Sequence, residues 1–112
     1  MLRIKQLFQD DNTNATLNVK ATAGLVYSVI FFNTGASAFS YQLHDTATTP
    51  SNGAVPKINM RIGSGSTFIL GSDFFTKYGV AFSNGIAFAI SSSALTLTLS
   101  SSTNQQSRIV YS

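Results

Sequence analysis

The chain has one histidine, His44, and a carboxylate, Asp45, follows it directly. An imidazole, a carboxylate and a serine hydroxyl form the catalytic triad of many hydrolases, and such triads are defined by geometry rather than by order in the sequence. The sequence has no Gly-x-Ser-x-Gly motif to mark a nucleophilic serine. Strand alternation in residues 39–45 predicts that Tyr41 and Leu43 face the core. It places Gln42 and His44 on the solvent-facing side, with His44 at the start of a loop. We therefore predict no catalytic residues, and a small hydrolase that uses His44 is the least favoured of three hypotheses.

A metal site is the second kind of chemistry to consider, because all four carboxylates of the chain are aspartates. Asp10 and Asp11, with Asn12 and Asn14, make an oxygen-rich segment, but it lacks the glycine and the bidentate glutamate of a calcium-binding loop. Aspartate and asparagine in turns more often bond to nearby backbone groups. The chain has no cysteine, which removes thiolate zinc ligands and thiol nucleophiles. We predict no metal and no cofactor.

Charged residues are few and scattered. Seven Lys and Arg against four Asp give a net charge of +3, and charged residues make up 10% of the chain. Nucleic-acid-binding proteins usually gather their cations into a patch, so no nucleic-acid partner is expected. No apolar run reaches the ~18 residues of a membrane helix. The N-terminal segment reaches Asp10 before an apolar stretch develops, which differs from a secretory signal. We expect no membrane partner and synthesis in a cytoplasm.

Polar and apolar residues alternate with the period of a β-strand along most of the chain. Residues 16–22, 39–45 and 94–100 show this pattern, whereas residues 25–32 are apolar on both faces. The doubly apolar run predicts a central strand that is covered from two sides. Eight to ten short strands at spacings near ten residues, with turn residues between them, are typical of an antiparallel sandwich. We predict an all-β fold, a single antiparallel β-sandwich of jelly-roll-like form.

Glycine-containing turns separate several of these strands. Residues 63–66 (Gly-Ser-Gly-Ser) stand between two alternating segments, and Asn84-Gly85 is a strong hairpin signal. We predict a hairpin at each position. Residues 71–79 are expected to form a loop or a short helical turn at the edge of the sandwich.

The polar break before the first clear strand divides the chain into two parts. Residues 1–14 are predicted to form an N-terminal arm, and residues 15–112 the sandwich domain. Because the recognisable strands all lie beyond residue 15, deletion of residues 1–8 is expected to leave the sandwich folded.

A series of turn and strand motifs runs from Tyr27 to Ser91. A strand that ends in an Asn-Thr turn precedes an aromatic-x-Leu strand, and a D-x-A-T-x-P loop follows at Asp45–Pro50. A Val-Pro strand, a Gly-rich turn and a G-[IV]-x-F-x-x-G-I-x-x-A segment at Gly79–Ala89 complete the series. This order, from Tyr27 to Ser91, resembles a group of short tailed-bacteriophage structural proteins associated with capsid decoration or other virion appendages. The resemblance implies a virion component without catalytic residues.

Our leading hypothesis is therefore a non-enzymatic virion protein, a capsid decoration (cement) protein on the outer head surface. Its partners would be the major capsid protein and further copies of itself, with a trimer implied by the resemblance. The alternative is a carbohydrate- or receptor-binding module of a tail fibre or baseplate. The arm is expected to contact other molecules by adding a strand to a sheet edge. Its predicted contact residues are Leu2, Arg3, Ile4, Lys5, Leu7 and Phe8.

Overall fold

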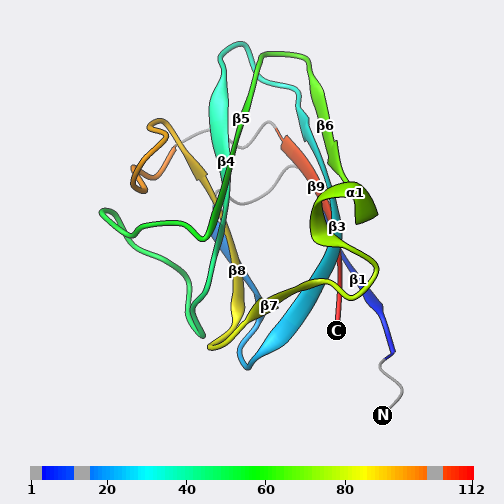
Figure 1. The fold of residues 1–112 in the computed structure, drawn as a ribbon. Helices are drawn as coiled ribbons and strands as arrows, with labels where there is room; N and C mark the ends of the chain where they lie inside the picture. The colour runs from blue at the N-terminus through cyan, green and yellow to red at the C-terminus, as the bar shows by residue number, and fades with distance from the viewer. Residues whose placement is uncertain (1–3, 12–15, 101–104) are drawn as a thin grey trace.

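Two antiparallel sheets pack face to face in the computed structural model, which describes residues 4–11, 16–100 and 105–112 (Figure 1). The five-stranded sheet has the order β1 (Gln6–Asp11), β9 (Gln105–Tyr111), β3 (Gly24–Asn33) and β6 (Thr67–Leu70), with β7 (Val80–Phe82) also paired to β3. The four-stranded sheet has the order β2 (Thr16–Lys20), β8 (Ile86–Ser91), β4 (Phe39–His44) and β5 (Ile58–Ile62). The predicted all-β sandwich of short antiparallel strands is confirmed.

The strands pair in a nested order. β1 pairs with β9, β2 with β8, β3 with β6, and β4 with β5. The chain thus resembles one long hairpin whose two arms have been wrapped into two layers. β7 lies outside this nesting, because it pairs with the first residues of β3. Most neighbouring strands are therefore distant in sequence.

The core lies between the sheets and is built from the inward residues of each strand. Phe31 of β3 stacks on Phe88 of β8 at 5.3 Å between ring centroids, and Tyr41 of β4 lies 5.3 Å from the same Phe31 ring. All three rings are buried. Aromatic pairs at this separation add to the burial of apolar area, so the contact of the two sheets is centred on this cluster.

The two predicted hairpins are wrong, although their strands are present. β5 belongs to the four-stranded sheet and β6 to the five-stranded sheet, so residues 63–66 cross between layers. The Asn84-Gly85 turn also crosses between the layers, because it connects β7 of the five-stranded sheet to β8 of the four-stranded sheet. A turn motif reports a local change of direction; the layer that receives the next strand depends on distant pairing partners. Residues 71–79 contain a short helix, α1 (Ser72–Phe75), as expected.

The expectation that residues 25–32 are covered from two sides is also wrong. β3 is central within its sheet, and Val29 and Phe31 are fully buried on its inner face. On its outer face, Ile30 is 42% exposed. A register shift between Val26 and Ser28 changes the alternation, so the inner and outer sets differ from a simple period of two.

The outer face of the four-stranded sheet is covered by the chain itself. Gln42, predicted to face solvent, is buried, and its Nε2 donates to the carbonyl of Ser93 at 3.4 Å. Residues 45–57 and 92–99 also bond to each other: Gly53 N donates to Leu97 O at 2.8 Å, and Leu97 N donates to Ala54 O at 2.7 Å. Residues 94–100, predicted as a strand, contribute an isolated bridge between Leu99 and Ser91. The rest of residues 94–100 helps to cover the outer face of the four-stranded sheet.

The segment expected to form an N-terminal arm contains a strand of the five-stranded sheet. Residues 6–11 form β1, which pairs with β9 from Gln6 opposite Tyr111 to Asp11 opposite Gln106. The expectation that all strands lie beyond residue 15 is therefore wrong. The reason is that β9, far along the chain, offers a pairing edge that local alternation cannot reveal.

Candidate functional site

His44 lies at the end of β4 and is buried, with 2% of its surface exposed. Its Nε2 lies 2.9 Å from Gln42 Oε1. Gln42 Nε2 donates to Asn59 Oδ1 at 3.0 Å and to Ser93 O, so the amide oxygen of Gln42 is left to accept from His44. Burial lowers the pKa of His44, which favours the neutral imidazole with its proton on Nε2. His44 lies on the outer side of its sheet as predicted, but the loops that cover that side remove it from solvent.

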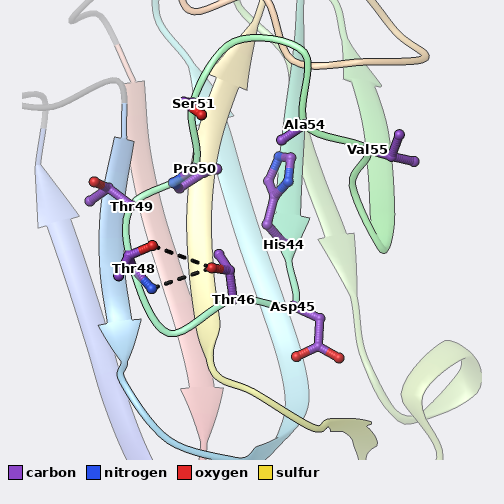
Figure 2. Close-up of a pocket in the computed structure, with 9 residues that line it drawn as sticks. All are labelled: His44, Asp45, Thr46, Thr48, Thr49, Pro50, Ser51, Ala54 and Val55. Carbon is purple, nitrogen blue, oxygen red and sulfur yellow. Dashed lines mark hydrogen bonds between the residues drawn. The ribbon is translucent and has the colours of Figure 1, made fainter.

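Asp45 does not orient His44, because its carboxylate caps a distant turn. Oδ1 accepts from Asn84 N at 2.8 Å and from Gly85 N at 3.4 Å, and Oδ2 accepts from Ser83 N at 3.0 Å. Partial desolvation acts to raise the pKa of Asp45, but these hydrogen bonds and the charge of Lys57 outweigh it and lower the pKa. Figure 2 shows the imidazole and the carboxylate pointing in opposite directions. The geometry is that of a structural cap.

A pocket of about 230 Å³ lies between His44 and the loop that follows it (Figure 2). Hydroxyl groups are common in its lining, and Thr46 Oγ1 accepts a hydrogen bond from Thr48 N at 3.3 Å. The complete lining is His44, Asp45, Thr46, Thr48, Thr49, Pro50, Ser51, Ala54 and Val55. No phenylalanine, tyrosine or tryptophan is among these residues, so the pocket lacks the large aromatic side chains on which a ligand commonly stacks.

Metal ligands do not gather in the described part of the chain, where no three His, Asp or Glu side chains lie together. The oxygen-rich segment considered above includes Asn12 and Asn14, which lie outside the described residues.

The outer face of the five-stranded sheet contrasts with the covered face of the other sheet. Leu7, Ile30 and Ile69 point outward from three different strands and are 59%, 42% and 66% exposed. Ile30 lies directly opposite Ile69 on β6 and Arg108 on β9. A hollow of about 170 Å³ on this face is lined by Ile30, Phe32, Gln106 and Arg108. We call the face formed by Leu7, Ile30, Phe32, Ile69 and Val110 the bare face.

The predicted contact residues that the structure describes differ in their exposure. Ile4 and Leu7 are exposed, whereas Phe8 is half-buried and packs against the core. The Lys5 Nζ lies 4.5 Å from the centroid of the Tyr27 ring, a cation–π contact. Leu2 and Arg3 lie outside the described residues. The structure thus leaves Ile4 and Leu7 as the apolar side chains of this set that are available to another molecule.

The sequence did contain a signal for the bare face. Ile30 and Phe32 belong to the doubly apolar run 25–32, a pattern that predicts cover from both sides. The same pattern arises when one face of a strand meets the core and the other meets no part of its own chain. The signal in the sequence was weaker for Ile69, because the four residues of β6 are too few to show a period of alternation.

The chain belongs to the class of two-sheet antiparallel β-proteins by its fold. No protein family, no curated protein and no solved structure matches the chain. Among the described residues, no helix has the length and hydropathy needed to cross a membrane.

Proposed function

We propose that this chain is a non-enzymatic structural protein of a tailed-bacteriophage virion, a capsid decoration (cement) protein on the outer head surface. The virion assignment rests on the resemblance of the stretch from Tyr27 to Ser91. The observation that carries the binding role is the bare face, where Leu7, Ile30 and Ile69 are exposed on one sheet. Several exposed apolar side chains on one sheet face of a small protein are a feature that contact with a partner would explain.

The nested strand pairing supports the same proposal. With β7 set aside as an addition, the first strand pairs with the last and the second with the next to last. We take this order to be that of a jelly roll, an architecture that recurs in viral capsid proteins and lectins. It therefore fits the decoration role and also the alternative role in binding carbohydrate.

The partner in this proposal is the assembled major capsid protein. A decoration protein that binds the assembled shell, and not free subunits, stabilises the shell by mass action. Many copies on one particle make a modest contact effective, because the shell loses its stabilisation only when many copies leave. The bare face would supply apolar burial, and the low charge of the chain makes salt a minor influence on attachment.

The test is attachment of the purified full chain to capsids of the phage that encodes it, with location by electron microscopy. Ile69→Lys places a charge in the bare face and is expected to weaken attachment at least ~10-fold. Leu95→Lys is the matched control, because Leu95 is 85% exposed in the segment that covers the other sheet. The binding role is contradicted if Ile69→Lys attaches as well as Leu95→Lys. The virion role is contradicted if wild-type protein ignores capsids.

The hydroxyl-rich pocket beside His44 favours one second candidate, a carbohydrate-binding module of a tail fibre or baseplate. Hydroxyl groups can hydrogen-bond a sugar, but sugar sites commonly also use the ring of a phenylalanine, tyrosine or tryptophan, which the described lining lacks. Binding of wild-type protein to host-surface polysaccharide, with loss of binding in Thr48→Val and no attachment to capsids, would favour this candidate over the decoration role.

A further inference from the structure

The edges of the two sheets differ in their protection against pairing with another strand. An edge strand exposes unpaired backbone N–H and C=O groups, which proteins shield with bulges, proline, lysine or short strands. In the four-stranded sheet, β2 has a register shift between Asn18 and Lys20, and β5 follows Pro56 and Lys57. The far edge of the five-stranded sheet is divided between β6 and β7, of four and three residues. Each of these edges has a shielding feature.

β1 is the longest edge strand in the described part of the chain, and its charged residues stand only at its two ends, Lys5 before it and Asp10 and Asp11 at its close. Its six residues pair with β9 in one continuous register, without a bulge or a proline. β9 occupies one side of β1, and none of the described strands lies on the other side. On its inner face Phe8 is half-buried at the rim of the core, and on its outer face Leu7 is exposed. A further strand would shield both side chains.

We propose that the free side of β1 pairs antiparallel with β1 of a second copy, around a two-fold axis, and joins two five-stranded sheets into one. The charge pattern of β1 favours this occupant over an unrelated strand. Lys5 precedes the strand, and Asp10 and Asp11 end it. Antiparallel self-pairing sets the cationic end of each copy beside the anionic end of the other. Opposite charges across two strands are stabilising, and like charges directly opposite are destabilising.

Symmetry restricts the register of this pairing. Residues directly opposite each other in an antiparallel pair share one face of the sheet, so positions of the same parity must meet. An axis through Phe8 sets Phe8 opposite its copy, Leu7 opposite Gln9, and Lys5 opposite Asp11. The two Phe8 rings then meet at the rim of the two cores. A two-fold contact closes at two copies, so it produces a dimer and not the trimer that the resemblance implies.

The test is a charge exchange, followed by sedimentation equilibrium of the full chain from about 1 µM to about 1 mM. Lys5→Asp and Asp11→Lys are each expected to raise the Kd of the dimer about tenfold or more, because each mismatched pair occurs twice. The double variant K5D/D11K is expected to return to within about threefold of wild type. Within one copy the two positions are ~20 Å apart along the strand, well beyond the ~8 Å screening length at physiological salt. Restoration must therefore come from the second copy.

Lys77→Asp is the control, because it changes the net charge equally at an exposed position after α1. Its Kd is expected to match wild type. A wild-type monomer over the whole range, a trimer, or a double variant as weak as the single ones would overturn the inference. A dimer weakened by Ile69→Lys and unaffected by Lys5→Asp would overturn it too, because the contact would then be the bare face. The experiment needs no capsid, so its outcome is separate from that of the decoration role.

Discussion

Replacement of Asp45 by alanine removes a carboxylate that accepts hydrogen bonds from three consecutive backbone N–H groups. These groups belong to Ser83, Asn84 and Gly85, where the chain crosses from β7 in one sheet to β8 in the other. Loss of a single capping side chain costs about 0.5–2 kcal/mol. Because three donors lose their acceptor but the site is partly open to water, we expect Asp45→Ala to lower the free energy of unfolding by about 2 kcal/mol. For a chain of 112 residues, this corresponds to about 8 °C in Tm.

The pH dependence of this loss provides a second measurement. Hydrogen bonding lowers the pKa of Asp45 below its ordinary value of 3.8. Its stabilising contribution is therefore complete above about pH 4 and is lost as the pH falls through the lowered pKa. Thermal and urea unfolding of wild type and Asp45→Ala should show a constant difference at neutral pH. The difference should shrink as the pH falls below 3.8.

Asp73→Ala is the control, because Asp73 is exposed in α1 and the change should alter stability by less than ~0.5 kcal/mol. Asp45→Asn keeps one acceptor oxygen and should fall between wild type and Asp45→Ala. Equal Tm values for Asp45→Ala and Asp73→Ala at pH 7 would refute the capping role. So would a stability difference that persists unchanged at the acidic end of the range.

Further predictions concern the turn, the buried imidazole and the core. Gly85→Ala would set a Cβ against the carbonyl oxygen of Thr46, so we expect a loss of more than about 2 kcal/mol in urea unfolding; Gly71→Ala, with open space around it, should be near neutral. The lowered pKa of His44 means that wild-type stability should fall as the pH drops below 6.5, and His44→Gln should lack this slope in chemical denaturation at each pH. Val29→Asp buries an unpaired charge at a fully buried position and should cost several kcal/mol; an unchanged Tm would contradict the core assignment.

Alternation in the sequence predicted most of the strands but not their partners; it missed β1 and indicated a strand at residues 94–100, where the structure has an isolated bridge. Tyr41 and Leu43 were expected to face the core, and both are buried there. Gln42 and His44, on the other side of the same strand, were expected in solvent. They are buried because residues 92–99 and the loop after His44 fold over them. Local alternation assigns a residue to a face, whereas its exposure depends on segments about fifty residues away.

Local sequence was also insufficient to interpret the role of individual residues, because their partners lie far along the chain. The adjacent pair His44 and Asp45 invited a catalytic interpretation, but neighbours in a strand point to opposite sides. The partners of Asp45 are the backbone groups of the turn at Ser83–Gly85, some forty residues later. The Asn-Gly signal in that turn was real. What it could not indicate was that a distant carboxylate completes the turn and that the chain then enters the other sheet.

The position of β9 between β1 and β3 also determines when the protein can fold during its synthesis. At about 5–20 residues per second, a ribosome releases the early strands seconds before β9 exists. Until then, β1 and β3 lack the strand that lies between them and pairs with both. The long stretch of chain between β3 and β9 must close into a loop before they pair, which makes folding slow. The bare face needs side chains from β1, β3 and β9, so it cannot form until β9 has been synthesised. Whatever binds this face must therefore act after β9 has emerged from the ribosome.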